Sequence, residues 1–114
     1  MILQIVLLIT KQSEGGIKVI LNYSPQRRDN TLTIIKAGDI LTINGTVYDF
    51  SQLPNGATLP REAFDCEFIV SDVNRVNGEI ELTILLPHSA NASHEARFPE
   101  PIIKNDDGQV VLPI

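Results

Sequence analysis

The chain has 114 residues, which suits one compact domain and leaves no room for a second independent core. Hydrophobic residues make up 43% of it, enough to bury a core and to exclude wholesale disorder. The net charge of −5 and the 5% aromatic content disfavour a nucleic-acid partner, because a phosphate backbone repels an acidic protein and single-strand binders need aromatic platforms. We therefore expect a single domain over residues 1–114, with its core in residues 17–113.

Residues 1–9 form an apolar run, and residues 2–9 of it fit either a buried strand or a short buried helix, since periodicity cannot decide in so brief a segment. The run lacks a basic flank and a small-residue cleavage site, so it does not resemble a secretory signal. It is also shorter than the roughly 20 apolar residues of a membrane helix. Cys66 is the only cysteine, which excludes an intramolecular disulfide and suits a reducing compartment. We expect a soluble protein, made inside the cell, without a membrane partner.

Residues 17–23 and 31–36 are rich in β-branched side chains and are predicted to be strands. The polar segment 24–30 between them is predicted to be a connection. The dipeptide Asn44-Gly45 then predicts a hairpin, because both central residues of a type I′ turn need a positive φ. A two-residue turn there pairs Leu41 with Tyr48 and Ile43 with Thr46. Four side chains then share one face, which we expect to be core: Leu41, Ile43, Tyr48 and Phe50.

Residues 51–66 lack β character and are predicted to hold a turn at 53–56 and a single helical turn after Pro60. Asn77-Gly78 predicts a second hairpin whose two faces differ sharply, which fixes its register. The predicted core face carries Ile69, Val73, Ile80, Leu82, Ile84 and Leu86. The predicted wet face carries Asp72, Asn74, Glu79, Glu81 and Thr83, with Val70 and Leu85 as apolar exceptions.

Residues 87–97 are predicted to form a long loop of small residues. Asp107-Gly108 predicts a short terminal hairpin between residues 102–105 and 109–112. Short strands separated by turns, with no amphipathic stretch long enough for a crossover helix, indicate an all-β protein with at most one short helical turn. The architectures that fit are a small antiparallel β-sandwich, a roll or a partly open barrel built from hairpins.

The histidines, the cysteine and the paired carboxylates are the residues that could form a catalytic or metal site. His88 and His94, with Glu95 or Cys66, do not follow a known zinc spacing. Cys66 lies between Asp65 and Glu67, whose charges disfavour a reactive thiolate. Ser89 beside His88 lacks the Gly-x-Ser-x-Gly elbow of a serine nucleophile.

The acidic and basic pairs also favour structural roles. Asp106-Asp107 belongs to a turn, and Glu79 with Glu81 decorates a wet sheet face. Arg27-Arg28 is followed at once by Asp29 and has no phosphate-binding motif around it. The sequence therefore predicts no catalytic, cofactor-binding or metal-binding residue, no cofactor, and a protein that is not an enzyme.

One segment remains as a candidate for interaction. An extended, proline-rich stretch can cross to a neighbouring subunit or add to a sheet edge. The alternative is that it covers the edge of its own domain. The candidate interaction residues are Phe98, Pro99, Glu100, Pro101 and Ile102.

Five phrases in order also carry a resemblance to a known family. They are SPQRRD at 24–29, GDILTING at 38–45, DFSQLPNGATLP at 49–60, LTILLPH at 82–88 and FPEPI at 98–102. Through them, over residues 17–113, the chain resembles a family of small bacteriophage and prophage proteins whose genes tend to lie near tail or tail-fibre genes. The usual glycine after the histidine of the LPH phrase is replaced here by Ser89.

The resemblance implies a phage-derived structural or assembly protein of the tail module, acting through protein contacts and carrying no catalytic residues. Its partners would be other tail proteins or further copies of itself as a homo-oligomer. It would be found in the host bacterial cytoplasm during assembly, or in the virion. The alternative is a small ligand- or protein-binding β module that holds its ligand between residues 51–66 and 87–97.

Overall fold

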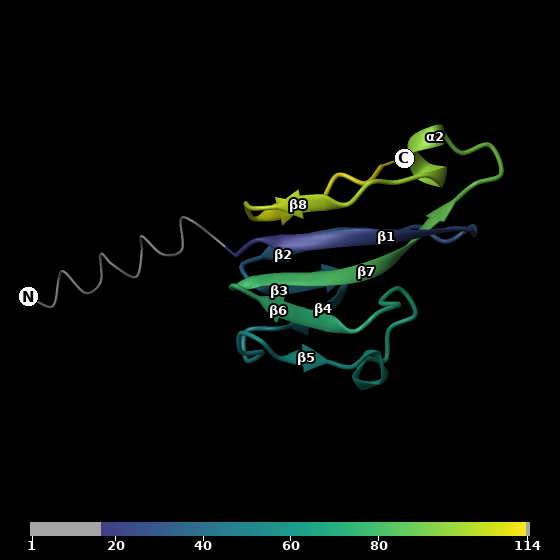
Figure 1. The fold of residues 1–114 in the computed structure, drawn as a ribbon. Coiled ribbons are helices and arrows are strands. Elements are labelled where there is room, and N and C mark those ends of the chain that lie inside the picture. The colour runs from purple at the N-terminus through teal and green to yellow at the C-terminus, as the bar shows by residue number, and fades with distance from the viewer. Residues whose placement is uncertain (1–16, 114) are drawn as a thin grey trace, which may run out of the picture.

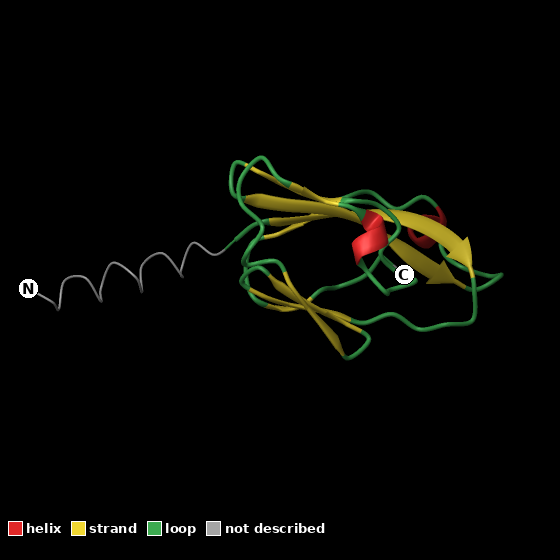
Figure 2. Ribbon diagram, turned by 90° about the horizontal axis from the view of Figure 1, so that it is seen from below, coloured by secondary structure: helices red, strands yellow, loops and turns green. Residues whose placement is uncertain are grey.

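The computed structural model describes residues 17–113, so the prediction for residues 1–9 lies outside the described residues. Two β-sheets face each other across one core and are not closed into a barrel (Figures 1 and 2). One sheet has the order β5 (Thr58–Leu59), β6 (Val73–Val76), β7 (Glu79–His88), β1 (Val19–Arg27) and β8 (Ile102–Lys104). The other has the order β4 (Thr46–Asp49), β3 (Ile40–Ile43), β2 (Ile34–Ala37) and β9 (Gly108–Gln109). The prediction of an all-β domain is confirmed.

The two Asn-Gly hairpins form with the predicted registers. In the β6–β7 hairpin Asn74 lies opposite Glu81, and the turn residues Asn77 and Gly78 have φ values of 53° and 82°. In the β3–β4 hairpin Leu41 lies opposite Tyr48, and Ile43 opposite Thr46. A type I′ turn requires positive φ at both central residues, which is why this dipeptide determined both registers correctly.

The core fills the space between the sheets with aliphatic side chains from both. Full burial of each contributes about 1.5 to 3 kcal/mol relative to exposure, so these residues supply most of the driving force for folding. The side chains that are almost completely buried are Val19, Leu21, Ile34, Leu41, Ile43, Ile69, Val73, Ile80, Leu82, Ile84 and Leu86.

β1 is longer than predicted, and one of its two neighbours runs parallel to it. It runs from Val19 to Arg27, so the prediction that residues 24–30 are a polar connection is wrong for the first four of them. It also pairs in parallel with β7, from Val19 opposite Ile80 to Arg27 opposite His88. This parallel pair needs no crossover helix, because the chain between β1 and β7 passes through the four-stranded sheet.

The predicted hairpin at Asp107-Gly108 does not form. β8 pairs with β1 in the five-stranded sheet, whereas β9 pairs with β2 in the four-stranded sheet, so residues 105–107 cross between the sheets. One carboxylate oxygen of Asp107 accepts hydrogen bonds from the Gly38 N–H (2.8 Å) and from Lys36 Nζ (3.1 Å). These long-range bonds fix the chain to the second sheet and outweigh the local preference for a hairpin.

The two irregular stretches contain short regular elements. Residues 51–66 hold β5 and the single predicted helical turn, η1 (Arg61–Ala63), which follows Pro60. In the predicted loop 87–97, β7 continues to His88 and the helix α2 (His94–Arg97) follows. The Ser93 hydroxyl caps α2 by accepting a hydrogen bond from the Ala96 N–H at 3.1 Å. This cap was not predicted, and the loop prediction is wrong for residues 87–88, which belong to β7, and for residues 94–97, which form α2.

Candidate functional site

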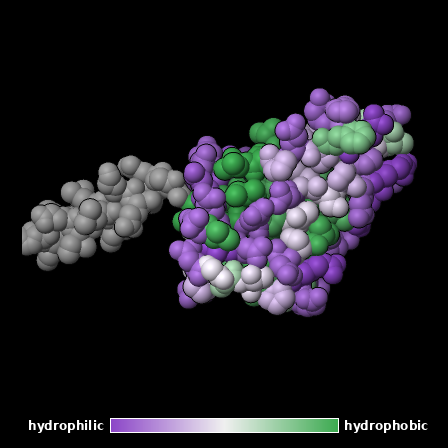
Figure 3. Space-filling model, viewed as in Figure 1, coloured by the Kyte–Doolittle hydropathy of each residue, from purple (hydrophilic) through white to green (hydrophobic). Residues whose placement is uncertain are grey.

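The predicted interaction segment lies along the outer edge of the five-stranded sheet. Its last residue, Ile102, pairs with Leu21 of β1, so this end of the segment covers the edge of its own domain. Phe98 is 64% exposed, and its ring lies 4.9 Å from that of His94 in α2. The next residue of β8, Ile103, is 58% exposed and lies opposite Ile20. Figure 3 shows apolar side chains gathered where β8 lies beside β1.

The histidines do not converge on a common site. His88 ends β7, with its Nδ1 2.9 Å from the Ser89 carbonyl oxygen, whereas His94 begins α2 and packs on Phe98. A cavity of about 220 Å³ beside His88 is lined only by residues of the segment 87–96. Within residues 17–113 no group of three or more His, Cys, Asp or Glu side chains is placed to hold a metal ion.

Cys66 is half-buried in a small aromatic cluster. A hydrogen bond between the Tyr48 hydroxyl and the Cys66 side chain, aided by burial and by the charges of Cys66 and Asp65, raises the pKa of Tyr48 to about 12. Phe64 packs edge-on against Tyr48, with ring centroids 6.3 Å apart. Cys66 and Phe64 therefore contact Tyr48 of β4 and hold residues 64–66 against that strand.

The paired charges take structural positions. Asp106 lies 3.2 Å from Lys104, and Asp107 binds Lys36 and the Gly38 N–H. Hydrogen bonds lower the pKa of both carboxyls, chiefly from Lys104 for Asp106 and from the Gly38 N–H for Asp107. The guanidinium of Arg28 forms an ion pair with Glu67 at 2.8 Å, so one cation of the Arg27-Arg28 pair already has a carboxylate partner.

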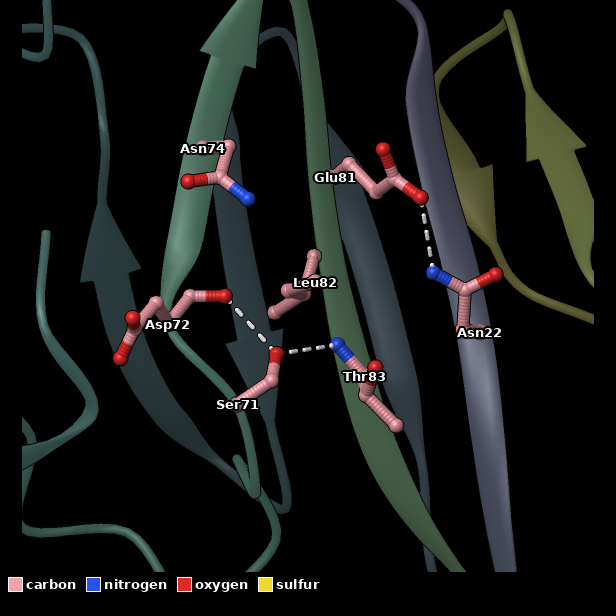
Figure 4. Close-up of a pocket in the computed structure, with 7 residues that line it drawn as sticks. All are labelled: Asn22, Ser71, Asp72, Asn74, Glu81, Leu82 and Thr83. Atoms are coloured by element: carbon pink, nitrogen blue, oxygen red, sulfur yellow. Dashed lines mark hydrogen bonds between the residues drawn. The ribbon is translucent and has the colours of Figure 1, made fainter. Parts of the chain in front are cut away.

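A polar depression of about 330 Å³ lies on the outer face of the five-stranded sheet (Figure 4). The Asn22 amide donates to Glu81 at 3.0 Å, and the Ser71 hydroxyl accepts from the Thr83 N–H at 2.8 Å while donating to the Asp72 carbonyl. These bonds hold the side chains in place around the depression. Carboxylates, amides and hydroxyls can all bond a polar ligand. The residues that line the depression are Asn22, Ser71, Asp72, Asn74, Glu81, Leu82 and Thr83.

Lys36 and Arg75 are buried cations that were not predicted from the sequence. Lys36 is 1% exposed and Arg75 is 7% exposed. Arg75 lies opposite Ile80, at a position that the predicted register already turned toward the core. Lys36 follows the same alternation in β2, two residues after the buried Ile34. Strand alternation was therefore the signal that could have found both.

Comparison with known protein-family models, curated proteins and solved structures found no match. Among residues 17–113 no helix is long and apolar enough to cross a membrane.

Proposed function

We propose that the protein is a non-enzymatic structural or assembly component of a phage or prophage tail module and that it acts through protein–protein contacts. The observation that carries this proposal is the exposure of Ile103 on the edge strand β8, beside Ile20 of β1, together with the exposure of Phe98 at the start of the same segment. Large apolar side chains grouped on a surface mark sites of protein association. The tail module itself is suggested by the sequence resemblance over residues 17–113. Its partners are other tail proteins, in the host bacterial cytoplasm during assembly or in the virion.

The segment is suited to such a contact by its backbone as well as by its side chains. Pro99 and Pro101 hold it extended and lack N–H donors, so they limit uncontrolled pairing with other strands. Phe98 and Ile103 then supply the apolar area, and β8 supplies a short strand edge for a partner.

Co-expression with the proteins of the same tail module tests the proposal. A tail protein should be retained by the wild-type chain and lost when Ile103→Lys places a charge on the contact. Val76→Lys is the matched control, because Val76 is 54% exposed on the distant β6–β7 hairpin. Failure to retain any tail protein, or equal retention by both variants, would contradict the proposed contact.

The second candidate function is a ligand-binding module, and the observation that favours it is the polar depression of Figure 4. Its location differs from the one expected from sequence, which was between residues 51–66 and 87–97. Ligand-induced chemical shift changes confined to Asn22, Ser71 and Glu81 would support this function. An unchanged spectrum across a panel of polar metabolites, together with capture of a tail protein, would exclude it.

A further inference from the structure

The four edge strands of the two sheets differ in how they are protected from pairing. β5 and β9 have only two residues each, and β8 has Pro101 before it and Lys104 at its end. Short length, proline and charged side chains, lysine above all, are the features by which proteins block edge-to-edge association. β4 has four residues, Thr46–Asp49, contains no proline, lysine or arginine, and carries its only charge on its last residue, Asp49. Within residues 17–113 it pairs only with β3, so its other edge is the least protected of the four.

The hairpin register shows which backbone groups of β4 point away from the sheet. In a two-residue hairpin the residues that flank the turn, here Ile43 and Thr46, exchange hydrogen bonds, and the bonded pairs then alternate. The Phe50 N–H donates to the Asp39 carbonyl at 3.0 Å, in agreement with this alternation. The N–H and C=O groups of Val47 and Asp49 therefore point outward, where a further strand would bond.

We propose that β4 pairs in antiparallel fashion with β4 of a second copy of this chain, with Val47 opposite Val47 of the second copy. The two four-stranded sheets would then form one continuous sheet across a two-fold axis. This inference concerns a different edge from Phe98 and Ile103, and it does not depend on the proposed tail function.

The charge on Asp49 selects this register from the alternatives. Three symmetric registers bring the outward-pointing backbone groups together, centred on Val47, Tyr48 or Asp49. Centring on Asp49 places two carboxylates directly opposite each other, which is destabilising. Centring on Tyr48 leaves them two residues apart, about 7 Å along the strand, which is within the Debye length of about 8 Å. Centring on Val47 separates them by four residues, about 13 Å along the strand. That distance exceeds the Debye length of about 8 Å at physiological ionic strength, so the repulsion is largely screened.

The side chains beside the edge also suit a second copy. Val47 is 62% exposed and lies opposite Thr42, which lies opposite Ile35 on the same outer face. The two-fold axis continues this uncharged row into the partner's sheet, so no buried charge has to be paired. The strand is short and each chain carries a net charge of −5, so the dimer should be weak and should tighten as salt is added.

Sedimentation of the full chain over a wide concentration range, at low and high salt, tests the proposal. The wild-type chain should dimerise at high concentration, and Val47→Lys should abolish the dimer. Thr42→Lys is the matched control, because it places the same charge on the same face of an inner strand. It should leave the dimer intact, and loss of the dimer in both variants would assign the contact to the sheet face and overturn edge pairing.

Crosslinking tests the register even where a charge prevents folding. In a Cys66→Ser background, Val47→Cys should give a disulfide-linked dimer on mild oxidation, and Asp49→Cys should not. A chain that stays monomeric at every concentration, or a Val47 amide protected from exchange within a monomer, would overturn the proposal. The second result would show that a segment of the same chain, such as residues 1–16, occupies the edge.

Discussion

Arg75 of β6 and Asp39, in the turn between β2 and β3, join the two sheets through the core: Nη2 of Arg75 lies 3.1 Å from Oδ2 of Asp39. The same guanidinium donates to the Phe50 carbonyl at 2.8 Å and to the Leu53 carbonyl at 2.6 Å. Arg75 thereby satisfies the carbonyls of the segment that leaves β4. A buried charge is tolerated there because it has a carboxylate partner and several acceptors.

Arg75→Met should lower the free energy of unfolding by about 3 kcal/mol, because it leaves the Asp39 carboxylate and the Leu53 carbonyl without their side-chain donor and removes one hydrogen bond each from the Phe50 and Gly78 carbonyls. Urea unfolding followed by circular dichroism measures the loss. Arg61→Met is the matched control: Arg61 is exposed in η1, and its replacement should change the free energy by less than about 0.5 kcal/mol. Equal effects of the two substitutions would show that the buried network contributes nothing.

The contact between Asp107 and buried Lys36 predicts a loss of stability in acid. The pKa of Asp107 is lowered from 3.8, first by the Gly38 N–H and then by Lys36. Because the folded-state pKa lies below the unfolded value, its contribution is present above about pH 4 and is lost as the pH falls through the folded-state pKa.

Asp107→Asn should therefore lower stability at neutral pH by about 1 kcal/mol, a modest value because the carboxylate is solvent-screened. Its urea midpoint should fall less on acidification than that of the wild type. Asp29→Asn removes an exposed carboxylate that does not contact Lys36 and should retain the wild-type profile. A profile of Asp107→Asn that overlays the wild type would refute the assignment.

The two tyrosines should titrate above their usual range in the folded protein. Burial raises the pKa of Tyr23 to about 12, and the contact with Cys66 raises that of Tyr48 to about 12. Near-ultraviolet absorbance should show little tyrosinate at pH 10 in the native state and about half ionisation in urea. Since both folded-state pKa values exceed the unfolded value, the stability they confer is present below pH 10 and is lost as the pH rises toward 12. Ionisation near pH 10 without unfolding would contradict this.

Turn dipeptides and the alternation of apolar residues correctly predicted the two Asn-Gly hairpins, whose geometry depends on residues close together in the sequence. Asn77-Gly78 fixes a turn by its backbone preference, and the alternation around it then fixes the core face. Arg75 was not predicted to be buried, because only apolar residues were assigned to the core face although Arg75 also lies at an inward position. Its long aliphatic stem nevertheless allows it to lie in a core when its head group finds acceptors.

Contacts between residues that lie far apart in the sequence were not predicted. Asp107-Gly108 has the residue types of a hairpin, yet the Asp107 carboxylate binds Lys36 and Gly38 about seventy residues earlier in the chain. The parallel pairing of β1 with β7 likewise joins segments that are separated by five other strands, β2 to β6. No local pattern encodes such a pairing, so the sheet order and the proposed β4 edge could be obtained only from the structure.

The two tyrosine hydroxyls provide a final, paired prediction. Among the described residues the buried hydroxyl of Tyr23 has no hydrogen-bond partner, whereas the Cys66 side chain beside the Tyr48 hydroxyl raises the pKa of Tyr48. Leaving a buried hydroxyl unsatisfied costs about 1 to 3 kcal/mol, so Tyr23→Phe should be neutral or stabilising by up to about 1 kcal/mol. Tyr48→Phe removes the same atom but loses the contact with Cys66, and it should destabilise by up to about 1 kcal/mol. Urea unfolding of both variants tests the contrast, and a clear destabilisation by Tyr23→Phe would show that this hydroxyl has a partner outside residues 17–113.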